Sequence, residues 1–406
     1  MPGVMDMISK AVRWHAGTGR LVLAGAVVAP AVMVLAQSAG ASPVPRISVI
    51  GWHLQSPPVP SGAIASDLSD VSCTSASACT AVGSDESSGS VFSTFAERWN
   101  GTSWTVENTP SPTVSNLNGV ACISPADCIA VGDVLSGVGI NTLTLAERWN
   151  GTSWTTMTTP TPKAGTRSFL IDVSCRSATL CEAVGSYYKK SGAQLPLAEK
   201  WNGASWKIQA TPQPSGTTST QLNGVACTSG SSCTAVGDYV SGSTEMLAER
   251  WDGTSWAIQS TPNPSGGSDS FLGGVSCTAA TACTATGDYF NGTGQVSLAE
   301  RWNGTSWTAQ ATPNRVGATN TGLVGVSCPS ASECVAVGAA TQGHLTKTDA
   351  EKWAGSAWKL QDPGIPAGSQ ESALVSVSCP ATADCTAVGW YVNGSGEDIV
   401  LAAQYS

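Results

Sequence analysis

The chain has 406 residues, of which only 12% are charged, and its formal net charge at pH 7 is −9. It contains no cluster of lysine and arginine. Nucleic acids and anionic membrane surfaces both need basic side chains to neutralise their phosphates, so this composition argues against either as a partner.

The first 41 residues have the layout of a secretory signal peptide. Lys10, Arg13 and Arg20 give a basic start, and the apolar run 21–36 is followed by Ala39-Gly40-Ala41. That triplet predicts cleavage after residue 41. The apolar run is shorter than the roughly twenty residues of a membrane span, and an uncleaved anchor is the alternative. The remaining chain, 42–406, carries a net charge of −11 and is expected outside the cell, free or associated with the cell wall.

Fourteen cysteines form seven pairs, each with five residues between its members, and successive first cysteines lie 49, 53, 52, 50, 51 and 51 residues apart. So steady a period indicates seven structural repeats. In an exported chain, paired cysteines predict disulfides. The expected bonds are Cys73–Cys79, Cys122–Cys128, Cys175–Cys181, Cys227–Cys233, Cys277–Cys283, Cys328–Cys334 and Cys379–Cys385. Zinc is the alternative, but each repeat offers two thiols and no histidine, so we expect no metal and no cofactor.

Each repeat contains four short apolar runs separated by turn residues. In the second repeat, Gly119–Cys122 and Cys128–Gly132 are predicted to form a hairpin around the five-residue loop between the cysteines. Leu145–Trp149 and Trp154–Thr158 follow, joined by an Asn-Gly pair that favours a tight turn. Four strands in about fifty residues are typical of a propeller blade. Helical solenoids are excluded because no stretch has apolar residues at helical spacing.

The two ends of the chain predict a closed ring. The seventh repeat stops after its third strand, at 401–406, and a segment resembling the missing fourth strand occurs at 50–57. Pairing these ends would remove two exposed strand edges, whereas an open solenoid would carry caps. The expected fold is all-β: a seven-bladed β-propeller over residues 42–406 with four antiparallel strands per blade, closed by an N-terminal strand that completes the C-terminal blade.

The repeat order A-V-G, variable stretch, E-R-W-N-G-T-S-W and T-P-x-P resembles a kelch-type repeat. It also resembles uncharacterised secreted bacterial propellers that carry W-N-G-T-S-W repeats. The chain departs from the kelch pattern in having Val-Gly instead of two glycines, and in its cysteine pairs. The resemblance covers 46–406 and implies a fold more than an activity, because kelch-like propellers include copper oxidases, glycan-directed proteins and protein-binding scaffolds.

A Glu-Arg or Glu-Lys pair precedes the third-strand tryptophan in six repeats. Six copies around a ring predict blade-to-blade packing or salt bridges instead of a catalytic site, and tryptophan pairs such as Trp99 and Trp104 predict blade core. Histidine is too scarce for copper oxidase chemistry. Some acidic residues lie outside the repeat pattern. They are either solvated charges on loops or the two carboxylates that a glycosidase needs. They are Asp85, Glu86, Glu245, Glu397 and Asp398.

Function in a ring of repeats is expected where the repeats differ, which is the stretch between the second and third strands. Aromatic residues and aspartates in and before this stretch are candidates for stacking on sugars or anchoring a protein. They are Tyr187, Tyr188, Tyr239, Tyr289, Phe290, Trp390 and Tyr391, with Asp133, Asp238 and Asp288. The alternative is that these residues only finish a strand.

The sequence therefore predicts a secreted, monomeric, non-catalytic protein that binds an extracellular glycan or protein through one propeller face. Two alternatives stay open: a glycosidase or lyase acting on polysaccharide, and a purely structural surface protein. No catalytic residue is assigned.

Overall fold

The computed structural model describes residues 51–406, apart from 90, 111–113, 137–140, 164 and 265. The described part of the chain forms 28 β-strands. Within it, no helix has the length and apolar character needed to cross a membrane. The predicted signal peptide, residues 1–41, lies outside the described residues.

The strands form seven four-stranded antiparallel blades, numbered from the inner strand outward. Blade 1 is β2 (Ala63–Ser75), β3 (Ala78–Ser87), β4 (Val91–Trp99) and β5 (Trp104–Asn108). Blade 2 is β6 (Ser115–Ser124), β7 (Asp127–Leu135), β8 (Thr142–Trp149) and β9 (Trp154–Met157). Blade 3 is β10 (Gly165–Ser177), β11 (Leu180–Lys189), β12 (Gln194–Trp201) and β13 (Trp206–Gln209). Blade 4 is β14 (Ser219–Ser229), β15 (Ser232–Ser241), β16 (Ser243–Trp251) and β17 (Trp256–Gln259).

Blade 5 is β18 (Ser268–Ala279), β19 (Ala282–Phe290), β20 (Gln295–Trp302) and β21 (Trp307–Gln310). Blade 6 is β22 (Asn320–Ser330), β23 (Glu333–Gln342), β24 (Leu345–Ala354) and β25 (Trp358–Gln361). Blade 7 is β26 (Glu371–Ala381), β27 (Asp384–Val392), β28 (Asp398–Tyr405) and β1 (Trp52–Gln55). Blades 3 and 4 also meet through one parallel bridge between Gln194 and Ser219.

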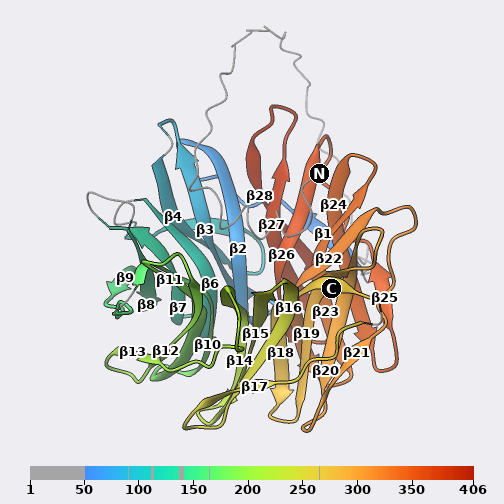
Figure 1. Cartoon of the computed structure of the whole chain (residues 1–406). Coiled ribbons are helices and arrows are strands. Elements are labelled where there is room, and N and C mark those ends of the chain that lie inside the picture. Colours follow the sequence, from blue (N-terminus) through green and yellow to red (C-terminus); the bar gives the residue numbers. More distant parts are fainter. Residues whose placement is uncertain (1–50, 90, 111–113, 137–140, 164, 265) are drawn as a thin grey trace, which may run out of the picture.

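The ring closes as the sequence predicts. The N-terminal strand β1 is the outer strand of blade 7 and pairs antiparallel with β28, with Trp52 opposite Tyr405 and Gln55 opposite Ala402. Figure 1 shows the first blade (blue) beside the last (red), with the inner strands around a common axis. The chain is a seven-bladed β-propeller.

The cysteine hairpin is tighter than predicted. β6 and β7 continue past Cys122 and Cys128, which face each other, to Ser124 and Asp127, so only two residues form the turn. All seven expected disulfides are present, with Cα–Cα separations of 4.0–4.1 Å. The strands reach beyond the cysteines because a register shift between Cys122 and Ser124 lets the ladder resume closer to the turn.

The repeated A-V-G glycine is required by a close backbone approach. In blade 4 the inner strand β14 has a register shift between Leu222 and Gly224, and Leu222 pairs with Gly237 of β15. A Cβ atom on Gly237 would lie 2.1 Å from the carbonyl oxygen of Gln221. The corresponding distance is 1.9–2.1 Å in all seven blades, so no other residue fits this place.

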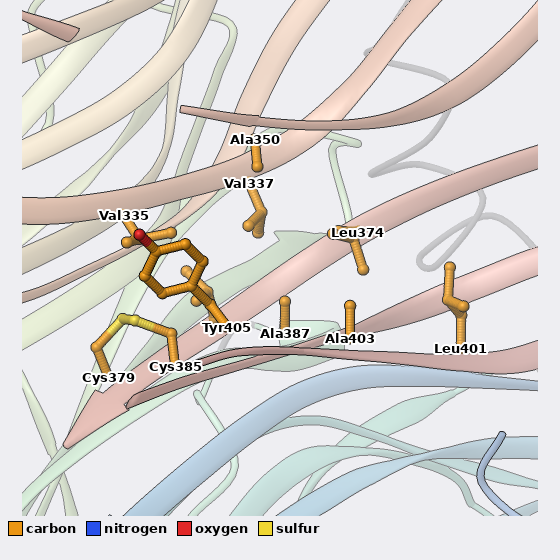
Figure 2. Close-up of a cluster of buried hydrophobic side chains, with 11 residues drawn as sticks. Val335, Val337, Ala350, Leu374, Cys379, Cys385, Ala387, Leu401, Ala403 and Tyr405 are labelled. Atoms are coloured by element: carbon orange, nitrogen blue, oxygen red, sulfur yellow. A yellow bond between two sulfur atoms is a disulfide. The ribbon is translucent and has the colours of Figure 1, made fainter. Parts of the chain in front are cut away.

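The hydrophobic core is divided among the contacts between neighbouring blades. One cluster joins Val335, Val337 and Ala350 of blade 6 to Leu374 and Tyr405 of blade 7. Figure 2 shows these side chains with the Cys379–Cys385 disulfide beside the tyrosine ring. Each blade therefore buries its apolar face only when its neighbour is present, as a ring of repeats requires.

The Glu-Arg pairs pack between blades, as their repetition predicts. The guanidinium of Arg98 lies 4.7 Å from the centroid of the Trp149 ring in the next blade. Equivalent stacks at 4.8–5.1 Å join Lys200 to Trp251, Arg250 to Trp302, Arg301 to Trp353 and Lys352 to Tyr405. Arg148 instead forms a salt bridge of 3.0 Å with Asp127. The glutamate side chains lie on the opposite side of the sheet from these cations and are fully buried.

Candidate functional site

The propeller has two distinct faces. Cys128, Trp149 and Trp154 lie side by side across three strands, so the disulfides and the Asn-Gly turns share one face, here called the disulfide face. The connections between second and third strands lie at the opposite ends of the strands, on what we call the loop face. The predicted ligand-binding residues belong to the second strands as these approach the loop face.

Most of the predicted aromatic residues pack within the blades. The half-buried side chains of Tyr187, Tyr239, Tyr289 and Tyr391 each contact the hydrophobic cluster that their blade forms with the preceding blade. Tyr188 is also half-buried and lies under Arg167, whose guanidinium is 4.5 Å from the ring centroid, and Phe290 is half-buried. The positions of the four tyrosines in paired strands explain their partial burial, because one side of each ring faces a hydrophobic cluster between two blades.

The three predicted aspartates are buried. Asp133 accepts hydrogen bonds from the amides of Asn116 and Asn118, both at 3.3 Å. Asp238 is bonded by Gln221 and Asn223, both at 3.0 Å, and burial raises its pKa despite these bonds. In blades 2 and 4 these contacts tie the second strand to the inner strand.

The inner strands of all seven blades surround an axial cavity of about 500 Å³. It extends from Asp67 and Trp390 to Cys175 and Arg176, the last two beside the disulfide face. Trp390, which is 8% exposed, is the only one of the ten predicted ligand-binding residues that lines this cavity in the described chain. A cavity of this size is large enough for a small ligand or one end of a chain.

Two aspartates in the wall of the cavity can form hydrogen bonds with a ligand. Asp70 accepts a hydrogen bond of 2.6 Å from the N–H of Val120 and one of 2.5 Å from the hydroxyl of Ser376. Asp172 accepts bonds of 2.7 Å from the N–H groups of Val173 and Val225. A carboxylate has about four acceptor positions, so both retain capacity for hydrogen bonds to a ligand.

The pKa values of both carboxyls are shifted upward. Burial raises the pKa of Asp70 to about 6. Burial, together with the nearby charge of Asp70, raises the pKa of Asp172 to about 8. Burial and the mutual repulsion of the two carboxylates favour the protonated form, in which a carboxyl group can both donate and accept hydrogen bonds.

Serine hydroxyls line the wall two residues further along the inner strands. The hydroxyl of Ser72 accepts a hydrogen bond of 3.0 Å from the N–H of Cys122 in the next blade. The same bond, at 2.9–3.0 Å, is made by Ser174, Ser276, Ser327 and Ser378. Each serine thus satisfies a backbone N–H at the inner edge of the neighbouring blade. Its own hydroxyl hydrogen can still be donated to a ligand.

Sequence reasoning missed this wall. Asp70, Asp172 and Ser376 occupy the place where the other four blades have glycine, in the motif L-x-G-V. Their departure from the repeat was the available signal. This signal is weak, because the three differences lie inside otherwise regular strands, whereas the longer stretches between the second and third strands vary much more.

A smaller pocket of about 40 Å³ lies at the seam of blades 7 and 1 and shares Asp67 and Trp390 with the axial cavity. Asp85, Glu86 and Asp398 also line it, so three of the acidic residues outside the repeat pattern come together here. Burial raises the pKa of Asp67 to about 6, and Asp398 adds to this shift. In the part of the chain that is described, no group of three or more histidines, cysteines or acidic residues is arranged to hold a metal ion.

Comparison with known proteins places the fold. No protein-family model and no curated protein matches the sequence. Among solved structures, YCF48 bound to a D1 peptide is similar with a TM-score of 0.53 and 12% identity, covering 89% of this chain and 99% of that one. A polysaccharide lyase of family PL25, an ulvan lyase, has a TM-score of 0.53 and 9% identity, covering 84% and 97%. A protein of unknown function from Dyadobacter fermentans has a TM-score of 0.50 and 8% identity, and the match covers 89% of this chain and 99% of that one. At such low identity these similarities show a shared β-propeller fold.

Proposed function

We propose that the protein is a secreted, monomeric, non-catalytic binding protein that recognises an extracellular glycan or protein through its loop face. The axial cavity carries the proposal. Its wall combines carboxyls, serine hydroxyls and the ring of Trp390. Hydroxyl-rich ligands need both donors and acceptors, so a glycan fits this lining better than an apolar ligand does.

Several parts of the proposal rest on the sequence. Secretion depends on the signal peptide over 1–41, the kelch-like assignment depends on the repeat pattern, and a ligand role for the loop-face aromatics depends on their place in the variable stretches. The fold accommodates both classes of partner. YCF48 is bound to a peptide, and a PL25 ulvan lyase to -[GlcA(1-4)Rha3S]-.

The test is retention of purified residues 42–406 on insoluble polysaccharides and cell-wall material, with the supernatant assayed for released sugar. We expect retention without release. Asp172→Gly should weaken retention and preserve the fold, because four other blades have glycine at this place. Loss of retention only in Tyr239→Ala/Tyr289→Ala would assign binding to the aromatic residues of the loop face and would contradict the role of the axial cavity. No retention of the wild type would contradict glycan binding and favour a protein partner or a structural role.

The alternative is a glycosidase or lyase, because the carboxyl groups of Asp70 and Asp172 line the same cavity. Burial raises the pKa of both, which is the direction that general acid catalysis near neutral pH requires. Released sugar that disappears in Asp172→Gly would establish this alternative.

A further inference from the structure

Blade 5 contains a line of buried oxygen atoms without hydrogen-bond partners. Thr286 and Asp288 of β19 are 0% exposed, and Ser297 of β20 is 3% exposed. Among the described residues, the Thr286 hydroxyl, both Asp288 carboxyl oxygens and the Ser297 hydroxyl have no partner. The amide oxygen of Gln295 also has none. A buried carboxylate is rarely left unpaired, because burial without a partner is strongly unfavourable. The six buried glutamates of the repeat, such as Glu249, also lack partners for both carboxyl oxygens. Blade 5 adds two unpartnered hydroxyls on the same side of the sheet as Asp288.

These side chains share one side of the sheet. Asp288 is directly opposite Ser297, and Thr286 is directly opposite Ala299. Ala299 packs in the cluster formed with Leu323 of blade 6. Since side chains two residues apart on a strand lie on the same side, the unpartnered oxygens face the interface of blades 5 and 6.

Blades 2 and 4 show what usually occupies this place. There, the amide of Asn118 donates to Asp133 at 3.3 Å and to the carbonyl oxygen of Leu170 in the next blade at 2.8 Å. Asn223 likewise donates to Asp238 and to the Leu272 carbonyl, both at 3.0 Å. The amide thus bridges a carboxylate and a carbonyl across the interface.

Blade 5 lacks the bridging amide. Gly273 stands where blades 2 and 4 have asparagine, and Phe271 is opposite Asp288 where they have Asn116 and Gln221. By the repeat, the corresponding carbonyl of the next blade is that of Leu323. The interface therefore keeps its acceptors and loses the donors that satisfied them.

We propose that a hard cation, Ca²⁺ or Na⁺, binds between blades 5 and 6, with the Asp288 carboxylate and the Ser297 hydroxyl as ligands and Thr286 and Gln295 as supporting oxygen donors. The donor set contains oxygen atoms only, which suits these ions and not the softer metals that prefer thiolate or imidazole. The positive charge replaces the missing amide hydrogens. It also keeps the carboxylate ionised, although burial raises the pKa of Asp288 well above its usual value. The site is separate from the axial cavity.

The test measures bound ions and thermal stability on the purified protein. After dialysis against a chelator in tetramethylammonium buffer, Ca²⁺ and Na⁺ are added separately, with Mg²⁺ for comparison, and bound calcium is counted by elemental analysis. We expect either one Ca²⁺ per chain or, if the ion is Na⁺, a rise in Tm with Na⁺ alone. Asp288→Asn should weaken binding at least roughly tenfold, equivalent to about 1.4 kcal/mol.

Asp238→Asn is the matched control. It changes the same position in blade 4, where Gln221 and Asn223 already supply donors, and should leave ion binding unchanged. Gly273→Asn would provide the bridging amide of blades 2 and 4, and should abolish the ion dependence. If the wild type retains no ion and neither Ca²⁺ nor Na⁺ changes its Tm, the proposal is wrong and Asp288 is held as a neutral acid. This wild-type result decides the matter even if a variant fails to fold.

Discussion

The indole N–H of Trp104 donates a hydrogen bond of 2.7 Å to the side-chain oxygen of Gln55. Trp104 begins β5 of blade 1, and Gln55 ends β1, the strand that closes blade 7. The amide nitrogen of Gln55 also donates to Gln404 of β28 at 3.0 Å. One glutamine thus connects the closing strand to its own blade and to the first blade.

We expect Gln55→Ala to lower the free energy of unfolding by about 1–2 kcal/mol, because the buried indole loses its acceptor. Urea unfolding measures the change. Gln209→Ala is the control, since Gln209 accepts the same 2.7 Å bond from Trp256 where the chain is continuous between blades. If ring opening begins at the closing blade, Gln55→Ala accelerates unfolding more than Gln209→Ala does. Unchanged stability would show that the closing contact contributes nothing.

Replacing both Cys122 and Cys128 by serine should destabilise the protein by about 2 kcal/mol in the chain-entropy account of small loops. The fold should persist, because the hairpin ladder continues beyond the cysteines to Ser124 and Asp127. Denaturant midpoints measure the loss, and near-ultraviolet circular dichroism reports the tertiary structure. Loss of that signal in buffer would mean that one disulfide is essential to its blade.

Glu249→Gln should make stability less sensitive to alkaline pH. Glu249 is 0% exposed, and burial raises its pKa from 4.5 to about 8. A raised folded-state pKa means that this contribution to stability is fully present below about pH 4.5 and is lost as the pH rises to about 8. Over that interval the wild type should lose roughly 1.4 kcal/mol per pH unit relative to the variant.

The pH profile of the difference in unfolding free energy between wild type and Glu249→Gln tests this sign. Glu397→Gln, at an exposed position, is the control for the same substitution outside the core. A flat profile for Glu249→Gln would show that water or another group compensates the buried charge. Five other glutamates share its burial, so the whole protein should unfold readily in mild alkali.

Gly237→Ala should be severely destabilising, by more than about 3 kcal/mol, because its Cβ would lie 2.1 Å from a backbone oxygen. Gly394→Ala is the matched control, since nothing lies within 4 Å of its Cβ position. Thermal unfolding of the two variants measures the contrast. A stable Gly237→Ala protein would mean that the inner strand can move away without disturbing the next blade.

The architecture could be predicted because its signals are local and repeated seven times. The Asn150-Gly151 turn needs only a residue that accepts positive φ, and Gly151 has φ of +96°. Closure followed from comparing the two ends of the chain. The paired strands near the cysteines were underestimated, because a register shift extends the ladder in a way that residue types do not reveal.

The candidate site could be predicted only in part. The ring of Tyr239 is half-covered by its own blade, and whether an aromatic residue next to a loop is covered depends on packing that spacing does not specify. Trp390 reaches the axial cavity through the seam between the last and first blades. Asp70 and Asp172 are near enough for their charges to interact because of ring geometry, although they are 102 positions apart in sequence.

All seven disulfides join cysteines six positions apart. The entropy of closing a loop favours near neighbours over distant ones, so native pairs should form ahead of the many possible wrong ones. Each hairpin can be oxidised as soon as its own two thiols emerge, without waiting for the rest of the ring. Oxidative folding of this chain should therefore need little disulfide isomerisation, and no disulfide joins one blade to another.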